Sequence, residues 1–143
     1  MHGDARRFGD LGIFGCGGSN VTPFHTPTEL SDAEIGLLLE RGYAAVKDAP
    51  HLLMLCHTPP AHTATDRITS GLHVGSLAVR AFIEAHQPAV CITGHIHESA
   101  GVDRIGRTTV VNAGALGAGG YIVVEAACDG LQAELRRVTS DEC

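Results

Sequence analysis

Two short apolar runs, each followed at once by histidine, constrain this chain more than any other feature. His51–Cys56 is one run of strand length, and Ala89–Thr93 is another. Apolar runs without alternation are typical of strands that are buried on both faces, as in a parallel sheet. Prolines at 59 and 60 end the first run, and Gly94 ends the second. The sequence therefore predicts parallel strands that end at a common edge of a sheet.

The segments around these runs predict helices and further strands. A helix is expected from about Asp32 to Lys47, because Ser31 and Glu34 have the spacing of a capping box. A second helix is expected after Ser76, and a long loop from His57 to about Gly75. Further strands are expected at Leu11–Cys16, Val102–Ile105, Arg107–Val111, Tyr121–Cys128 and Leu131–Val138.

Asp129-Gly130 is a strong signal for a hairpin turn between the last two of these strands. Helices that alternate with buried strands, followed by hairpins, indicate an α/β fold with a mixed sheet. The length of 143 residues suits a single domain.

Composition excludes several classes of protein. Apolar residues make up 44% and charged residues 18%, which is not the profile of a disordered chain. A net charge of −6 with scattered basic residues argues against nucleic acid as a main partner. No apolar run approaches the length of a membrane span, so no membrane partner is expected, and the absence of a secretory signal predicts a cytoplasmic location.

The five cysteines have irregular spacing and form no C-x-x-C pair. Cys56 and Cys91 lie within the apolar runs and are predicted to be small buried hydrophobes. An alternative is a structural zinc site that combines Cys16, Cys56 or Cys91 with histidines. It is disfavoured because strand-interior cysteines point to alternate faces and lack the spacing of a zinc knuckle.

Three histidines follow the ends of the two apolar runs: His57, His95 and His97. Ligands of open α/β sheets bind beyond the carboxyl ends of strands, and imidazole is a common ligand of Zn, Mn and Fe. A single loop histidine is usually only solvated, which is the interpretation preferred for His2, His51, His62 and His86. Taken together, the three that follow strands favour a metal site.

These residues carry a resemblance to a known family. Gly94-His95-Ile96-His97 is the G-H-x-H motif of calcineurin-like metallophosphoesterases, and Cys56-His57-Thr58-Pro59-Pro60 resembles the isolated histidine motif that precedes it. Blocks in the same order resemble a branch of small bacterial and archaeal members over nearly the whole chain: Gly17–Phe24, Asp66-Arg67, Gly71–Ser76 and Gly94–Asp103. Asn112-Ala113-Gly114 matches a segment where members often have Asn-Pro-Gly.

The resemblance implies an α/β sandwich of two mixed sheets flanked by helices. It also implies hydrolysis of phosphomonoesters or phosphodiesters by two divalent metal ions, of which Mn, Fe, Zn and Ni are not distinguished. His57 and His95 would be ligands of one ion, and His97 of the other. Candidates to contact the substrate or to support the ligands are Asn20, Thr58, Arg67 and His73.

Two of these candidates have plain alternatives. His73 lies in a loop flanked by glycines, and it could approach a phosphate or be an ordinary loop residue. Arg67 is expected to form a structural ion pair with its neighbour Asp66.

Only the last two of the five motifs of the family are present. No D-x-H, G-D-x-x-D or G-N-H precedes His57, and Gly3-Asp4 and Gly9-Asp10 are interpreted as turns. The chain is therefore expected to be the C-terminal portion of a metallophosphoesterase, a single incomplete domain over residues 1–143. The catalytic histidine of the third motif is absent as well, so no catalytic residue is assigned.

The missing carboxylates have an electrostatic consequence. Two dications ~3.75 Å apart at an effective dielectric constant of ~20 repel by on the order of 18 kcal/mol. Neutral imidazoles do not offset that repulsion, so this chain alone is expected to hold at most one metal ion, loosely, and to be inactive or weakly active. The alternative function is a degenerate, non-catalytic binding domain. Missing strands would also leave a sheet edge open, which predicts a homo-oligomer.

Overall fold

A computed structural model describes residues 1–23, 25–127 and 130–138. Its centre is a six-stranded mixed sheet in the order β1-β2-β5-β6-β8-β7. The four inner strands are parallel, and β1 and β7 run antiparallel to their neighbours at the two edges. The strands are β1 (Asp4–Phe8), β2 (Leu11–Cys16), β5 (His51–Cys56), β6 (Val90–Thr93), β7 (Gly101–Ile105) and β8 (Thr108–Asn112). The predicted α/β fold with a mixed sheet is confirmed.

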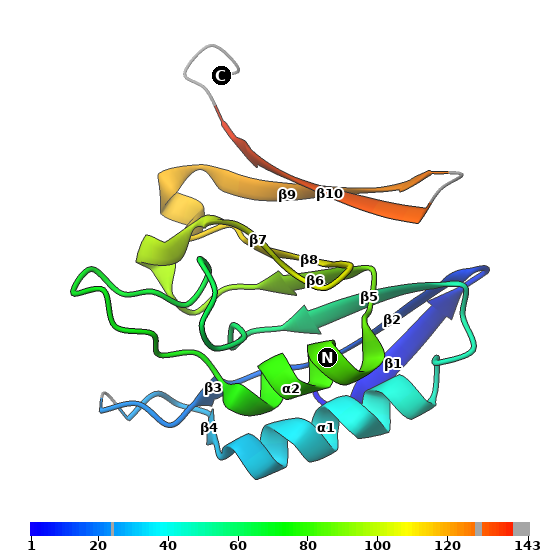
Figure 1. The fold of residues 1–143 in the computed structure, drawn as a ribbon, viewed down its shortest axis with the longest axis horizontal. Helices are drawn as coiled ribbons and strands as arrows, with labels where there is room; N and C mark the ends of the chain where they lie inside the picture. The colour runs from blue at the N-terminus through cyan, green and yellow to red at the C-terminus, as the bar shows by residue number, and fades with distance from the viewer. Residues whose placement is uncertain (24, 128–129, 139–143) are drawn as a thin grey trace.

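Helices α1 (Asp32–Ala44) and α2 (Leu77–His86) cover one face of the sheet (Figure 1). The predicted capping box is present, since the Ser31 hydroxyl accepts from the backbone N–H of Glu34 and the Glu34 carboxylate accepts from that of Ser31. Ser76 caps α2 in the same way, accepting from the N–H of Val79. Helix α1 ends at Ala44, earlier than predicted, and the chain continues in turns.

The main core lies between this face and the helices. Phe14, Met54 and Cys91 project from the sheet and are fully buried against Leu39 and Ile83 of the helices. Cys16 and Cys56 are buried in the same cluster as free thiols. Burial raises the pKa of the Cys91 thiol to about 12. Packing in the core, as predicted for Cys56 and Cys91, therefore accounts for these cysteines better than zinc binding does.

A hairpin of β9 (Gly120–Ala127) and β10 (Gly130–Arg137) lies over the opposite face of the sheet (Figure 1). Strand β10 contacts β5, β6 and β8. Because side chains alternate along a strand, the buried Leu53, Val90 and Val111 point toward this hairpin. The two predicted strands are confirmed, whereas Asp129 of the predicted turn lies outside the described residues.

Several short elements were not predicted from the sequence. Strand β1 carries exposed Arg6 and Arg7, and charged residues on an edge strand discourage pairing with another chain. Gly9, with φ of 57°, turns the chain from β1 into β2. The others are β3 (Ser19–Asn20), β4 (Glu29–Leu30) and the short 3-10 helices η1 (His97–Ser99) and η2 (Leu116–Ala118). Over the described ranges, no helix is long and apolar enough to cross a membrane.

Candidate functional site

The parallel pairing of β5 with β6 brings His57 and His95 together, as the order of the motifs leads one to expect. The centroids of the two imidazole rings lie 5.3 Å apart, at an interplanar angle of 62°. The two residues are far apart in sequence and meet only because both strands end at the same edge of the sheet. Two neighbouring imidazoles at this edge form the centre of the candidate site.

The backbone of His57 is fixed from both sides. Its N–H donates to the carbonyl oxygen of Cys16 at 3.0 Å, which continues the pairing of β5 with β2. Its carbonyl oxygen accepts from the N–H of Gly94 at 3.1 Å and from the hydroxyl of Thr93 at 3.2 Å. The position of His57 is therefore set by the sheet, although its side chain is exposed.

His95 has a left-handed backbone conformation, with φ of 63°. A residue other than glycine in this region costs on the order of 1 kcal/mol, so the surrounding structure must hold it there. Asn112, buried at the end of β8, holds the turn: its amide donates to the carbonyl oxygens of Ile96 at 2.9 Å and Gly94 at 3.4 Å. Its own oxygen accepts from the N–H of Gly114 at 2.8 Å. This is a positioning role that the sequence analysis did not assign.

His97 begins the 3-10 helix η1 and is exposed. It lines a cavity of about 500 Å³ together with His95 and Glu98. Asn20 and Thr22 line the same cavity from the opposing loop. A second cavity of about 530 Å³ lies beside His57 and His95, against the loop that begins at Gly17. His95 thus stands between two hollows large enough for a small ligand.

Partial desolvation and repulsion between neighbouring imidazoles lower the pKa values of His57 and His95. Although the residue is exposed, partial desolvation of its ring lowers the pKa of His57, and repulsion from His97 lowers it further. Burial also lowers the pKa of His95, with added contributions from His57 and His97 and a smaller opposing one from Glu29. The neutral form is the one that binds a metal ion, so both lowered pKa values favour coordination.

The residues fit part of a metal centre. Among the described residues, no group of three or more His, Cys, Asp or Glu side chains is arranged to hold a metal ion. His57 and His95 lie close enough to be two ligands of a single metal ion. No carboxylate among the described residues joins the histidines in a group that could bridge two metal ions. The part of the chain that the structure describes therefore lacks the donors for a dinuclear centre.

The other predicted residues lie near the histidines in different surroundings. Thr58 is buried, and its hydroxyl accepts from the N–H of Asn20 at 3.0 Å and donates to the carbonyl oxygen of Gly18 at 3.2 Å. Thr58 therefore joins β5 to the glycine loop. The Asn20 amide donates to the carbonyl oxygen of Val74, while its side-chain oxygen is buried with no partner among the described residues.

The prediction of an ion pair between Arg67 and Asp66 is wrong. The Arg67 side chain is exposed and donates to the carbonyl oxygen of Gly71, whereas the buried Asp66 carboxylate lies 2.6 Å from Nδ1 of His73. The Asp66 carboxylate is directed into the loop, toward the N–H groups of His62, Thr63 and Gly75, which separates it from the Arg67 side chain. Burial alone would raise the pKa of Asp66, but bonds from His73 and three backbone N–H groups outweigh it and lower that pKa.

The loop that carries Asp66 is tied to the turn that carries the histidines. The Ser99 hydroxyl donates to the carbonyl oxygen of Arg67, and the Glu98 carboxylate accepts from the N–H of Thr69. Asn112 adds a bond to the carbonyl oxygen of Thr65 at 3.2 Å. Most of the sequence blocks that carry the resemblance therefore meet around one end of the sheet.

Comparison with known families agrees with this arrangement. The family model for metallophosphoesterases of the calcineurin superfamily matches residues 34–135. The chain belongs to this family. It is also 37% identical over 111 residues to the uncharacterized protein MJ1162 of Methanocaldococcus jannaschii, a match that covers 75% of this chain and 50% of that protein. The chain thus spans about half the length of the curated relative it matches.

Solved structures share the fold of this chain. One crystal structure aligns with a TM-score of 0.74 and 22% identity, over 97% of this chain and 54% of its own. The crystal structure of TT1561 of Thermus thermophilus aligns with a TM-score of 0.62 and 20% identity, over 95% and 57% of the two chains. Both similarities concern the fold alone.

Proposed function

We propose that this chain supplies the histidine-bearing part of a metal centre that hydrolyses a phosphomonoester or a phosphodiester. The observation that carries the proposal is the 5.3 Å approach of the His57 and His95 rings at the strand ends. Membership of the metallophosphoesterase family supports the class of reaction. His57 and His95 would hold one divalent ion and His97 would belong to a second.

The remaining ligands would come from residues outside those described here. Two observations support this part of the proposal. No carboxylate of the described residues joins the three histidines in a metal-binding group. The chain also spans only half of its curated relative, which leaves room for ligands in a longer polypeptide. When bound, the metal would polarise the phosphoester and activate a water molecule.

The chain's own residues would position the substrate. The cavity between Asn20 and Glu98 opens beside His95 and His97, next to the proposed metal ligands. The buried, unpartnered oxygen of Asn20 belongs to a residue that lines this cavity. The His73 ring is held through Nδ1 by the buried Asp66 carboxylate, so His73 would act by fixing the loop that borders this cavity. Thr58 would act indirectly, through the loop that contains Asn20.

A non-catalytic function is the second candidate, and the missing carboxylates favour it. A single ion held by His57 and His95 has too few protein ligands to be held tightly. The chain would then bind a metal ion or a partner without turnover. Enzyme assays and metal titrations separate the two functions.

The test measures hydrolysis of p-nitrophenyl phosphate and bis(p-nitrophenyl) phosphate by the purified chain with added Mn²⁺. Hydrolysis that is lost in His95→Ala but kept in His51→Ala, at the opposite end of the strands, supports catalysis. Absence of turnover in the native chain is expected under both functions, because the hydrolytic centre needs further ligands, so the metal titration decides whether the histidines form a metal site. Calorimetric titration with Mn²⁺ is run alongside: an affinity at least tenfold weaker in His57→Ala and His95→Ala supports the metal site, and unchanged affinity in both overturns it.

A further inference from the structure

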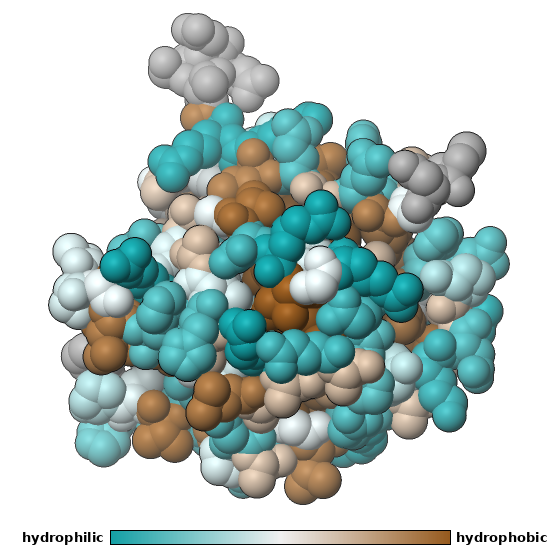
Figure 2. All heavy atoms as spheres, in the orientation of Figure 1, coloured by the Kyte–Doolittle hydropathy of each residue, from teal (hydrophilic) through white to brown (hydrophobic). Residues whose placement is uncertain are grey.

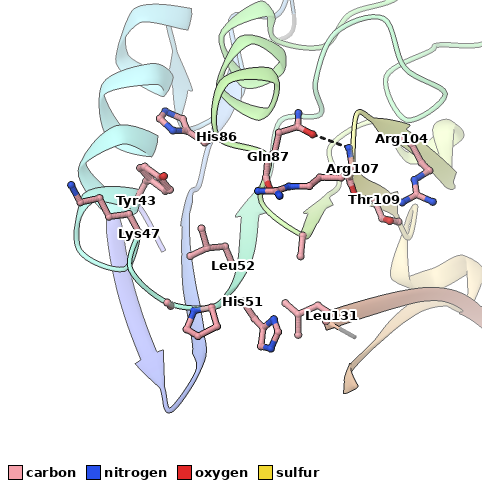
Figure 3. Close-up of a pocket in the computed structure, with 14 residues that line it drawn as sticks. Tyr43, Lys47, His51, Leu52, His86, Gln87, Arg104, Arg107, Thr109 and Leu131 are labelled. Atoms are coloured by element: carbon pink, nitrogen blue, oxygen red, sulfur yellow. Dashed lines mark hydrogen bonds between the residues drawn. The ribbon is translucent and has the colours of Figure 1, made fainter. Parts of the chain in front are cut away.

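A third cavity, of about 560 Å³, lies at the opposite end of the sheet from the histidine site (Figure 3). It is bounded by the ends of α1 and α2, by the first residues of β5 and β8, and by the start of β10. His51 lines this cavity and His57 follows the same strand, so the two sites are about 20 Å apart at ~3.3 Å per residue. The cavity is therefore separate from the proposed metal centre.

Its charge is opposite to that of the whole chain. Lys47, Arg104 and Arg107 line it, which is three of the ten lysine and arginine residues of a chain with a net charge of −6. No aspartate or glutamate is among its described lining residues. None of the three cations forms an ion pair within the described ranges. Three positively charged side chains without an ion-pair partner among the described residues line one cavity, which favours the binding of an anion.

Compensation of the helix dipoles does not account for all of this charge. The C-termini of α1 and α2 both face the cavity, and each carries a partial charge of about −0.5. Together they offset only about one of the three positive charges. The helix ends therefore do not balance the three cationic side chains, and the cavity favours an anion such as a phosphate group.

Arg107 is fixed in place before any ligand binds. Its backbone N–H donates to the side-chain oxygen of Gln87 at 2.8 Å, and its Nε donates to the Gln87 carbonyl oxygen at 3.3 Å. Gln87 is itself held at the end of α2 by a bond from its amide to the carbonyl oxygen of Ile83. Gly106 has φ of 60°, and a Cβ there would lie 2.2 Å from the Gln87 side chain, so this turn packs closely against Gln87. The Arg107 guanidinium would therefore lose little conformational freedom when a ligand binds.

The cavity also offers apolar surface. Figure 3 shows Arg107 reaching across it, with Lys47 and Arg104 on opposite sides and Leu52 and Leu131 beneath it in the view. The space-filling view shows hydrophilic residues around a hydrophobic patch, between the hairpin and the helices (Figure 2). Tyr43 also lines the cavity, and the centroid of its ring lies 4.3 Å from that of the His86 ring.

We infer that this cavity is a binding site for a small organic phosphate, with the phosphate on Arg107, the charges of Lys47 and Arg104 attracting the anion from either side, and the organic part on Leu52 and Leu131. The inference does not depend on the proposed hydrolytic function. It assigns to the chain a second anion site, remote from the metal centre.

The experiment is a calorimetric titration of the purified chain with phenyl phosphate and with inorganic phosphate, in EDTA and at low ionic strength. EDTA removes metal ions, so binding at the histidine site does not contribute. Phenyl phosphate is expected to bind several-fold more tightly than inorganic phosphate, because only its ring covers the leucines. Its affinity should fall at least tenfold in Arg107→Gln and also as salt is added.

Matched variants make the outcome decisive. Arg6→Gln removes an exposed arginine from β1, and His95→Ala alters the other site, so both should bind phenyl phosphate as the native chain does. Circular dichroism checks that Arg107→Gln is folded, and Lys47→Gln, which leaves the Gln87 contacts intact, should also bind more weakly. Equal affinity in the native chain and in both cavity variants overturns the inference. An equal loss in Arg6→Gln also overturns it, because binding is then a non-specific effect of net charge.

Discussion

The side-chain nitrogen of Asn112 lies 2.9 Å from the carbonyl oxygen of Ile96, between the two histidines of the G-H-x-H turn. Strand β8 therefore holds a turn that follows the neighbouring strand β6. The turn needs this support, because His95 has φ of 63° and Ile96 comes directly after it. A residue outside the candidate ligand set thus holds the backbone of the turn that carries His95.

Replacing Asn112 with alanine should destabilise the fold and disturb the site together. The buried Asn112 amide loses its bonds to the carbonyl oxygens of Gly94, Ile96 and Thr65, and the Gly114 N–H loses its acceptor, at a cost of about 1–3 kcal/mol. Urea unfolding measures this loss. Asn112→Asp keeps the acceptor for Gly114 but sets an oxygen against the two carbonyls, so it should be no more stable than Asn112→Ala. Native stability in Asn112→Asp would show that the Gly114 bond alone matters.

Much of the fold could be predicted because its signals are local. The capping box at Ser31, the cap at Ser76 and the apolar runs that became β5 and β6 all depend on neighbouring residues. The approach of His57 to His95 could also be anticipated, because one general rule places the carboxyl ends of parallel strands together. The sequence analysis needed only the positions of the histidines relative to those strand ends.

The rest depends on contacts that the sequence does not display. Strand β1 has no apolar alternation, and it exists only because β2 offers an edge for pairing. Asp66 is next to Arg67 in sequence, yet it bonds to His73 because the loop folds back on itself. The cationic cavity joins Lys47 to Arg104 and Arg107 through the packing of helix ends on strands. No local sequence pattern predicts that these three residues lie around one cavity.

Asp66 should make the free energy of unfolding depend on pH. Its carboxylate accepts from the N–H groups of His62, Thr63 and Gly75 and from His73, and these bonds lower its pKa below 3.8. The unfolded chain therefore takes up the proton first. The stabilising contribution is complete above pH ~4 and is lost as the pH falls through the lowered pKa.

The matching variant is Asp66→Asn, which turns an acceptor into a donor that faces backbone N–H groups. It should lose about 3 kcal/mol at pH 7, and the difference from the native chain should shrink as the pH falls from 4 to 2. Urea unfolding at each pH measures this difference. Asp10→Asn, in the exposed turn before β2, is the control and should be neutral. A difference that stays constant down to pH 2 would contradict the role of the ionised carboxylate.

The buried thiols should resist alkylation in the native chain. Burial raises the pKa of Cys91 to about 12 and that of Cys56 well above its ordinary value, so almost no thiolate forms at pH 8. Iodoacetamide should therefore leave both residues unmodified in buffer and modify both in urea. Peptide mass spectrometry identifies the labelled positions. Rapid labelling of Cys91 without denaturant would show that β6 is exposed to solvent.

Gly15 should tolerate no side chain, because β2 and β5 approach closely at that point. A Cβ on Gly15 would lie 1.8 Å from the carbonyl oxygen of Leu55, and backbone cannot move aside as a flexible side chain could. Gly15→Ala should therefore cost about 3 kcal/mol or more and weaken the pairing that fixes the backbone of His57 to Cys16. Thermal unfolding measures the cost. Gly117→Ala, where a Cβ meets nothing within 4 Å, is the control and should leave the melting temperature nearly unchanged. Equal melting temperatures for the two variants would mean that the strands separate freely at Gly15 and that β2 does not position His57.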